Sequence, residues 1–251
     1  MSEENKLDLS CCDNPVRNKF TSTGQKENVA LSVEEDIWPV AGPYPFNAVN
    51  ENCRIFSDNV GDTAAGAGAQ LIKLTGLSNG LLVTETVALN GTTPVNLVNQ
   101  YNRIFNGEVS RAGSNETNLG IINIQQTTSF LVLGQMDPAT GNFLNAIFTV
   151  PTNWSPLKLI KFAGSFECDN ASAPIGRIFL KYKPGSTGGW TTLSTMSIST
   201  SGNNPFNFND PTETESFLFL PNYDIKMSVF TNASPAVGIN KAYASFTIKE
   251  T

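Results

Sequence analysis

The chain has 251 residues, of which 40% are hydrophobic and 15% charged, and its formal net charge is -6 at pH 7. This length is enough for one large β-sandwich or two small domains, and the sparse, acidic charge argues against nucleic-acid binding, because affinity for phosphates comes mainly from clustered cations. Histidine is absent, which excludes Ser-His-Asp and Cys-His catalysis and removes the commonest metal ligand, but leaves catalysis by paired carboxylates open.

The chain contains four cysteines without a metal-binding or redox spacing. No C-x-x-C pair occurs, and the two adjacent cysteines are not expected to pair with each other. We expect reduced thiols of an intracellular protein at Cys11, Cys12, Cys53 and Cys168.

The beginning of the chain has no targeting pattern. Its polar first twenty residues lack the apolar segment of a signal peptide, and no apolar run approaches the roughly 18 residues of a membrane span. We therefore expect a soluble protein made in a cytoplasm. Five Asn-x-Ser/Thr sequons are expected by chance in a chain rich in Asn and Thr, and their glycosylation is left open: Asn90, Asn115, Asn153, Asn170 and Asn232.

Residues 1–50 differ in composition from the rest of the chain. They carry mixed charges and end in DIWPVAGPYPFNAVN, where three prolines preclude a regular helix or a central strand. The pattern predicts an extended arm with aromatic anchors. Such an arm either packs its rings on its own core or buries them in a neighbouring subunit. We take the second as the hypothesis, with interface residues Trp38, Tyr44 and Phe46, so that deleting residues 1–48 leaves a folded domain.

Strand patterns begin at residue 51, and the clearest lies in GLSNGLLVTETVALNGTTPV, 76–95. Asn79-Gly80 predicts a hairpin with a type I′ turn, which needs positive φ at both central residues. This turn places Ser78 opposite Leu81 and so fixes the register. The face expected to be buried carries Ile72, Leu74, Val83, Val87 and Leu89, with Glu85 as its only acid, placed opposite Leu74.

Short strands separated by Gly, Pro and Asn turns continue to the end of the chain. Three of them have one apolar face: Ile160, Phe162, Gly164 and Phe166; Ile178, Leu180 and Tyr182; and Ala242, Ala244, Phe246 and Ile248. No convincing amphipathic helix and no fixed-period repeat is present, which favours a sandwich or barrel. The sequence predicts an all-β, jelly-roll-like β-sandwich over 51–251, preceded by the arm over 1–50.

Four patterns suggest possible sites, and each also has a purely structural interpretation. GAGAQLIKL lacks the Gly-Lys-Ser/Thr ending of a phosphate loop and precedes a strand, so we interpret it as a flexible connector. The acids Asp210, Glu213 and Glu215 match no calcium motif and fit a solvated loop. Glu85 alone is not a carboxylate pair and fits a sheet edge or an ion pair. Packing, rather than a sugar platform, is favoured for Trp38, Trp154 and Trp190.

The segments DTAAGAGA, 62–69, and TETVALNGTTPV, 84–95, carry a family resemblance. They resemble virion structural proteins of marine tailed phages and of large DNA viruses of algae, and NAIFTVPTNWSPLKLIKFAGSF, 145–166, is similar to a further segment of that family. The similarity covers roughly residues 58–168 and is weaker to the end, and residues 1–50 have no counterpart in it.

The resemblance implies a capsid-associated structural role and brings no catalytic motif. We expect a minor capsid, vertex or cement protein that is not an enzyme, has no cofactor or metal, is made in the host cytoplasm and resides in the virion. Its expected partners are other capsid proteins, the major capsid protein above all, and further copies of itself in a pentamer or trimer. A glycan-binding fibre or head-decoration module, and a carboxylate-dependent glycosidase, are the alternatives.

Overall fold

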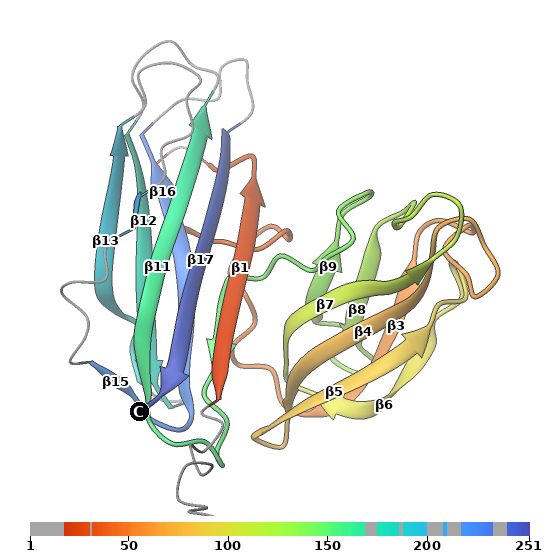
Figure 1. The fold of residues 1–251 in the computed structure, drawn as a ribbon, viewed down its shortest axis with the longest axis horizontal. Coiled ribbons are helices and arrows are strands. Elements are labelled where there is room, and N and C mark those ends of the chain that lie inside the picture. The colour runs from red at the N-terminus through yellow and green to blue at the C-terminus, as the bar shows by residue number, and fades with distance from the viewer. Residues whose placement is uncertain are drawn as a thin grey trace, which may run out of the picture.

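The computed structural model describes residues 18–30, 32–168, 175–185, 188–199, 208–209, 217–232 and 240–251. Every regular element in these ranges is a β-strand, so the expected all-β, sandwich-type fold is confirmed. The strands form two bodies that stand side by side (Figure 1). Each body has its own cluster of buried hydrophobic side chains, and we call them the larger and the smaller sandwich.

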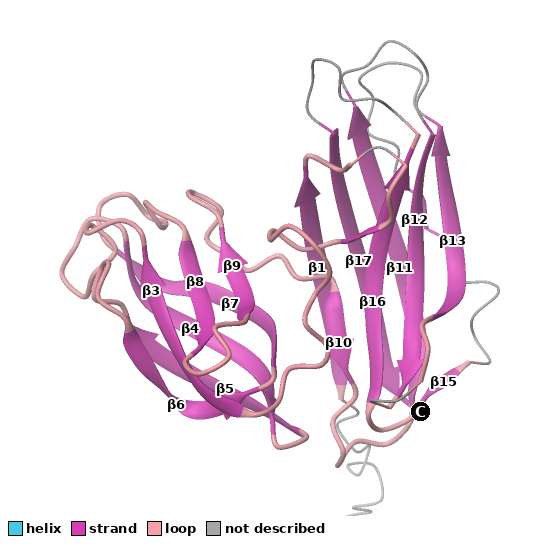
Figure 2. Ribbon diagram, turned by 180° about the vertical axis from the view of Figure 1, so that it is seen from behind, coloured by secondary structure: helices cyan, strands magenta, loops and turns pink. Residues whose placement is uncertain are grey.

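The larger sandwich consists of two five-stranded antiparallel sheets. Figure 1 looks onto the sheet of β1 (Lys19–Glu27), β17 (Asn240–Glu250), β11 (Leu157–Cys168), β14 (Phe208–Asn209) and β15 (Leu218–Phe219). Figure 2 looks onto the sheet of β10 (Ile147–Thr149), β16 (Tyr223–Thr231), β12 (Ile175–Pro184), β13 (Thr191–Ser199) and β2 (Glu35–Asp36). Apolar side chains alternate into the space between the sheets, as two-sheet packing requires.

The smaller sandwich is a curled pair of antiparallel sheets. One sheet has the order β6 (Val95–Tyr101), β3 (Glu51–Ser57), β8 (Ile122–Gln126) and β9 (Val132–Met136). The other has the order β5 (Leu81–Ala88), β4 (Ala69–Ser78) and β7 (Arg103–Ala112). The smaller sandwich is inserted in the chain between β2 and β10, so the larger one is built from both ends of the sequence.

This division differs from an arm over 1–50 and one sandwich over 51–251. Residues 1–17 lie outside the described ranges, but 19–27 form β1, which pairs along its whole length with β17. Residues 37–46 belong to the larger sandwich, because Ile37, Trp38, Tyr44 and Phe46 are in its core. The N-terminal region therefore completes a sheet of its own chain and is not a free arm over its described part.

Strand β1 was missed because its buried side is small and polar. Ser22 is 2% exposed, and its hydroxyl donates to the carbonyls of Asn145 at 2.9 Å and Ile147 at 3.1 Å. A Cβ atom on Gly24 would lie 2.4 Å from the Cβ of Ala146. Because the backbone at 145–147 lies so close to β1, only small residues such as Ser22 and Gly24 fit there. These residues do not produce the alternating hydrophobic pattern by which a strand is recognised in a sequence.

The hairpin predicted at Asn79-Gly80 is confirmed. The φ angles are 50° at Asn79 and 78° at Gly80, and Ser78 pairs with Leu81. Leu74 pairs with Glu85 as expected. On the predicted face, the three fully buried residues are Ile72, Leu74 and Leu89, while Val83 and Val87 pack beside them.

The apolar face predicted for β11 needs one correction. The register against β17 shifts between Leu159 and Lys161, and Ile160 is 38% exposed instead of facing inward with Phe162. Leu157 and Leu159 fill the core before this bulge, because the extra residue reverses the alternation of the side chains. The faces predicted for β12 and β17 are confirmed, since Ile178 and Leu180 are buried, as are Ala242, Ala244, Phe246 and Ile248.

Candidate functional site

The most elaborate side-chain arrangement lies at the junction of the two sandwiches, around residues 36–50. There the aromatic rings of Trp38, Tyr44, Phe46 and Trp190 form a chain of edge-to-face contacts. The ring centroids are 5.0 Å apart from Trp38 to Tyr44, 5.0 Å from Tyr44 to Phe46, and 4.8 Å from Phe46 to Trp190. Such edge-to-face pairs add to the stabilisation that burial provides.

The three rings proposed as a subunit interface are buried inside their own chain. Trp38 is 2%, Tyr44 3% and Phe46 8% exposed. The hydroxyl of Tyr44 donates to the carbonyl of Leu133 at 3.1 Å and accepts from the amide of Ile104 at 3.0 Å. Burial holds the pKa of Tyr44 well above its usual range. The interface hypothesis for these rings is therefore replaced by an intramolecular role: they join the two sandwiches.

Buried charges lie beside these rings. Lys226 contacts Asp36 at 2.5 Å, and Asp224 lies 3.2 Å from Lys183 and 3.7 Å from Arg103. All five side chains are at most 11% exposed. Buried charges are tolerated when they are paired and hydrogen-bonded. The pairs therefore require the strands that carry these five residues to keep their positions relative to one another.

Arg103 links the smaller sandwich to this charged group. It begins β7, and its guanidinium donates to the carbonyls of Phe46, Ala48 and Asn102, the last at 2.7 Å. Its Cζ also lies 5.2 Å from the centroid of the Phe46 ring. The planar guanidinium group has several N–H donors in fixed directions, so it can bind the carbonyls of Phe46 and Ala48 at the same time. A lysine ammonium group lacks this fixed geometry.

The apolar part of the junction is a cluster of three phenylalanines from three strands. Phe20 of β1 stacks on Phe148 of β10 with centroids 4.2 Å apart, and Phe105 of β7 lies 4.8 Å from Phe148 and 5.9 Å from Phe20. Because Phe105 belongs to the smaller sandwich and is buried in the core of the larger one, the two cores are in contact.

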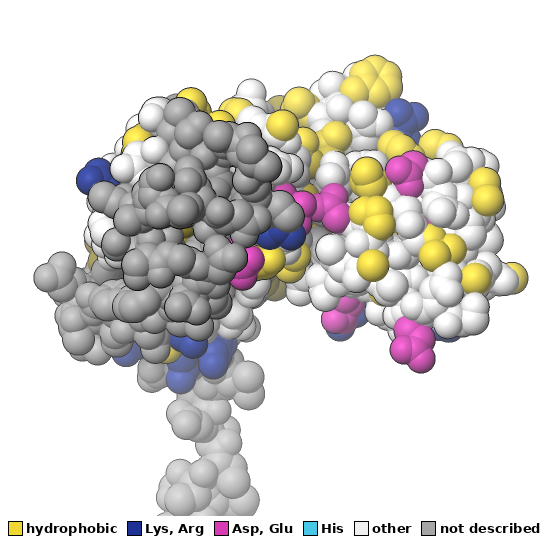
Figure 3. Space-filling model, turned by 90° about the horizontal axis from the view of Figure 1, so that it is seen from above, with side chains coloured by type: hydrophobic (Ala, Val, Ile, Leu, Met, Phe, Trp, Pro, Cys, Tyr) yellow, Lys and Arg dark blue, Asp and Glu magenta, His cyan; other side chains and the backbone are white. Residues whose placement is uncertain are grey.

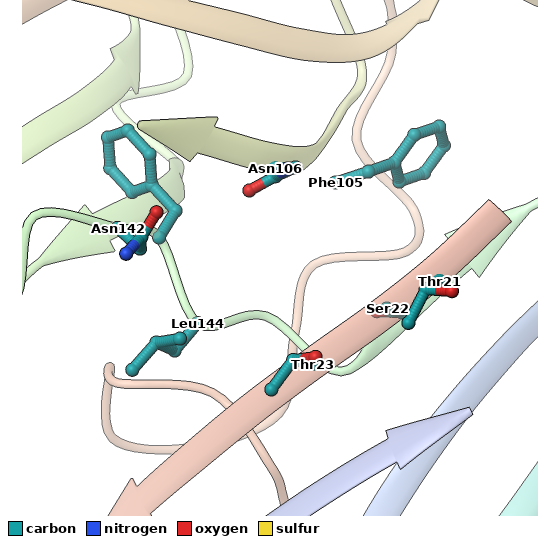
Figure 4. Close-up of a pocket in the computed structure, with 8 residues that line it drawn as sticks. Thr21, Ser22, Thr23, Phe105, Asn106, Asn142 and Leu144 are labelled. Atoms are coloured by element: carbon teal, nitrogen blue, oxygen red, sulfur yellow. The ribbon is translucent and has the colours of Figure 1, made fainter. Parts of the chain in front are cut away.

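A polar cavity of about 310 Å³ opens next to this cluster. Figure 4 shows Thr21, Ser22 and Thr23 along β1 on one side, and Asn106, Asn142 and Leu144 across from them. The lining offers hydroxyl and amide groups but no charged side chain among the residues that the structure places there. This cavity separates the two sandwiches where they are not in direct contact.

The tip of the Asn79-Gly80 hairpin is a further contact between the sandwiches. The carbonyl of Gly80 accepts from the amide of Thr152 at 2.8 Å and from its hydroxyl at 3.1 Å. The amide of Asn79 donates to Oδ1 of Asn50 at 3.0 Å. The hairpin therefore positions the smaller sandwich as well as forming part of it.

The glycine-rich segment 61–68 is an ordered loop around Asp62. The Asp62 carboxylate is fully buried and accepts from the amides of Ala69 at 2.8 Å, Leu119 at 2.9 Å and Gly120 at 2.9 Å. A Cβ atom on Gly68 would lie 2.1 Å from Oδ1 of Asp62. The segment is a connector and not a phosphate loop, as predicted, but it is not the flexible one that was expected, because amides of Ala69, Leu119 and Gly120 hold its buried carboxylate.

Glu85 lies at a sheet edge, one of the two alternatives considered for it. Its Oε2 accepts from the side-chain amide of Asn99 at 2.7 Å and from the backbone amide of Asn99 at 3.1 Å, so it joins β5 to β6. Cys53 is fully buried, and desolvation by burial raises its pKa to about 11. Cys53 is therefore a protonated core thiol, consistent with the expected reduced state.

The other predicted site residues are packed or lie outside the described ranges. Trp154 and Trp190 pack against the core of the larger sandwich, which confirms the packing interpretation for the tryptophans. Cys11, Cys12, the side chain of Cys168, the sequon at Asn170 and the acids Asp210, Glu213 and Glu215 are not among the described residues. Within the described part, no three His, Cys, Asp or Glu side chains are grouped to hold a metal ion, and no helix could span a membrane.

Sequence reasoning missed the charged group at the junction. One signal was available: Asp224 and Lys226 interrupt the apolar strand YDIKMSVFT, and Arg103 does the same in QYNRIFNGEV. A charge inside an apolar strand indicates either an exposed edge or a buried ion pair. The pattern could not show which charges meet, because Arg103 and Asp224 are far apart in the chain.

The chain has low similarity to known proteins. No family model and no curated protein matches the chain. Among solved structures, the infectious bursal disease virus VP2 subviral particle is 12% identical, with 93% of this chain and 72% of that chain covered and a TM-score of 0.22. The T=1 particle of infectious bursal virus and the T13 viral particle are both 13% identical over 93% of this chain and 69% of theirs, with TM-scores of 0.21 and 0.22.

Proposed function

We propose that this chain is a structural protein of a virus capsid, occupying a minor-capsid, vertex or cement position. The resemblance of segments 62–69 and 84–95 to virion structural proteins carries the proposal. In the structure these segments are the Asp62 loop, strand β5 and the turn into β6, all in the smaller sandwich. Under this proposal the chain acts by assembly and has no catalytic role.

The junction supports this function. Aromatic contacts, buried ion pairs and the Gly80 contact hold the two sandwiches together at several points. A capsid subunit must transmit contacts from one neighbour to another without bending, and a multiply joined pair of sandwiches has this property. The described part of the predicted arm fixes the junction, which leaves the outer faces of the sandwiches for assembly contacts.

The outer face of the β6-β3-β8-β9 sheet is the best assembly surface among the described residues. It carries Asn96, Asn123 and Gln125 together with one charged residue, Arg54, which pairs with Asn96 and Gln125. Val98 of β6 is 93% exposed. Figure 3, which looks at the molecule from above, shows separated hydrophobic side chains and a few charged ones on the otherwise uncharged surface of the smaller sandwich. Neutral surfaces of this type are common in protein interfaces, where charged residues are depleted at the core.

Light scattering of the purified chain, alone and with the major capsid protein of the same virus, tests the proposal. We expect a closed pentamer or trimer, or a complex with the capsid protein, that persists in moderate salt, because screening over about 8–10 Å weakens exposed ion pairs but not apolar contacts. Val98→Glu is expected to abolish assembly. The matched control is Val33→Glu, since Val33 is 53% exposed on the larger sandwich. A chain that remains monomeric and does not bind the capsid protein contradicts the proposal.

A glycan-binding module is the second candidate, favoured by one exposed aromatic cluster. The Arg54 guanidinium lies 5.8 Å from the ring centroid of Phe56 and 5.6 Å from that of Phe130. Phe130 is 60% exposed and has a φ of 58°, a strained conformation for a bulky residue that is often associated with function. A glycan array tests it: binding that Phe130→Ala removes at an unchanged melting temperature favours this candidate, and no binding eliminates it.

A further inference from the structure

Three lysines stand in a row across the outer face of the larger sandwich, on strands β1, β17 and β11. Lys19 pairs with Lys249, and Lys249 pairs with Lys158. Their neighbours Ile248 and Leu159 are buried, so the lysines point outward. Figure 1 shows the three strands side by side, and the row lies where β1 and β11 begin and β17 ends. We call these three residues the lysine row.

The other end of the same three strands carries charges of opposite sign. Glu27 pairs with Lys241, and Lys241 pairs with Glu167. Nζ of Lys241 lies 2.7 Å from Oε1 of Glu27, and this hydrogen bond raises the pKa of Lys241. Opposite charges facing each other across strands stabilise a sheet, whereas like charges destabilise it. The lysine row is therefore an unfavourable arrangement that an anionic partner would relieve.

A fourth lysine adds to the positive charge on β11. The bulge in this strand leaves both Ile160 and Lys161 on the outer side, where Lys161 is exposed. The acid next to the row, Glu250, accepts from the backbone amides of Asn18 at 2.9 Å and Ser155 at 2.8 Å. The carboxylate of Glu250 thus holds the chain at this end of the sheet.

Large aliphatic side chains are exposed among these lysines. Leu218 of β15 pairs with Lys158, so it continues the row onto a fourth strand, and it is 42% exposed. Leu220 is 43% exposed and Ile160 is 38% exposed. The surface therefore offers ammonium groups and aliphatic groups side by side.

This combination favours one class of anionic partner. A nucleic-acid backbone would engage the lysines and leave the aliphatic side chains unused, because its affinity comes from phosphate neutralisation. Protein interfaces are depleted in lysine. An anionic bilayer presents charged headgroups directly above hydrocarbon, and it attracts both basic and apolar side chains.

We propose that this end of the larger sandwich binds the surface of an anionic lipid membrane. The ammonium groups of the lysine row and of Lys161 lie among the headgroups. The side chains of Ile160, Leu218 and Leu220 reach the boundary between the headgroups and the acyl chains. The contact is peripheral, and the inference does not depend on the capsid proposal.

Vesicle flotation of the full chain tests the inference, with phosphatidylcholine vesicles that contain or lack phosphatidylserine. We expect the chain to bind at least about tenfold more tightly to the vesicles with phosphatidylserine, and added salt to weaken this binding. Equal binding to the two kinds of vesicle, or binding to neither, overturns the proposal. Duplex DNA that binds as tightly as the anionic vesicles would identify a general polyanion site and overturn the lipid assignment.

Charge variants separate the lysine row from the overall charge of the protein. Lys19→Gln combined with Lys158→Gln is expected to weaken vesicle binding about thirtyfold, because each lysine near an anionic surface contributes about fivefold. Both residues are exposed, and the melting temperature should not fall, since repulsion within the row is removed. The matched control combines Lys73→Gln with Lys241→Gln, which removes the same charge elsewhere and leaves binding unchanged. Equal effects of the two double variants refute the site.

An apolar variant separates a lipid surface from a purely electrostatic site. Leu218→Ser is expected to weaken binding to the anionic vesicles at least about fivefold, because burial of the aliphatic side chain drives this part of the contact. Val60→Ser, at a residue that is 75% exposed on the smaller sandwich, is the control and leaves binding unchanged. Unchanged affinity in Leu218→Ser overturns the assignment to a lipid surface.

Discussion

Gly80, at the tip of the β4–β5 hairpin, accepts two hydrogen bonds from Thr152 of the larger sandwich, at 2.8 Å from its amide and 3.1 Å from its hydroxyl. The two residues are distant in the sequence and belong to different sandwiches. A turn that looks local in the sequence is therefore also a contact between the two bodies, so its residues are constrained both by the turn and by Thr152.

Replacing Gly80 by valine is expected to destabilise the protein by about 1–3 kcal/mol, the usual range for a strained backbone position. The φ of 78° disfavours a β-branched residue, and a Cβ atom would lie 2.7 Å from Cγ2 of Thr152. Urea unfolding measures the loss. The control is Gly189→Val, because no atom lies within 4 Å of a Cβ there. An unchanged midpoint for Gly80→Val would count against this account.

Asp62→Asn is expected to destabilise the smaller sandwich by about 2–3 kcal/mol, because hydrogen bonds to a charged acceptor contribute more than neutral ones and the amide group of Asn would face backbone donors. Asp62 accepts four such bonds, from Ala69, Leu119, Gly120 and the hydroxyl of Ser57. Thermal unfolding is the measurement. Asp58→Asn, at an exposed acid that accepts one bond from Ile121, should change little, and equal effects at both positions would contradict the prediction.

Arg103→Lys is expected to cost about 1–3 kcal/mol, the range for leaving a buried hydrogen-bonding group without its partner. Lysine keeps the charge but loses the fork that binds the carbonyls of Phe46 and Ala48. Urea unfolding gives the magnitude, and faster proteolysis within residues 37–50 should accompany it. Arg111→Lys, at an exposed position on the same strand, is the control. The prediction fails if the two variants are equally stable.

Cys53 is expected to resist alkylation at pH 8 until the protein unfolds. Burial raises its pKa from 9.0 to about 11, so the reactive thiolate is scarce in the folded state. Because the folded pKa is the higher one, this group contributes stability below pH 9 that is lost as the pH rises towards about 11. Peptide mapping after iodoacetamide treatment, with and without urea, measures the reactivity of Cys53. Rapid labelling without urea would show that the thiol is accessible.

Deletion of residues 1–48 is expected to unfold the larger sandwich, in contrast to the folded domain that the sequence pattern predicts. The deletion removes β1, which pairs with β17, and the core side chains of Ile37, Trp38 and Tyr44. Circular dichroism and thermal melting of the truncated chain check this. A truncated chain with a cooperative transition near that of the full protein would restore the idea of a separable arm.

The sequence alone determined the all-β class, the register of the Asn79-Gly80 hairpin and the buried faces of β12 and β17. These features depend on residues close in the chain: a turn that requires positive φ, and a period of two in the side chains. The sequence also indicated that Glu85 and the glycine-rich segment are parts of the scaffold, because neither has the partners that a catalytic or phosphate site requires.

Tertiary structure decided what depends on residues far apart in the chain. Strand β1 forms because it pairs with β17 and because Ser22 donates a hydrogen bond to the carbonyl of Asn145. Ile160 is exposed because a bulge shifts the register of β11 against β17. The rings of Trp38, Tyr44 and Phe46 are internal because the smaller sandwich, inserted between β2 and β10, packs beside them. Arg103 of the smaller sandwich donates to the carbonyl of Phe46. Charge pairing and close backbone packing act between surfaces that only the folded chain brings together, so no local pattern records them.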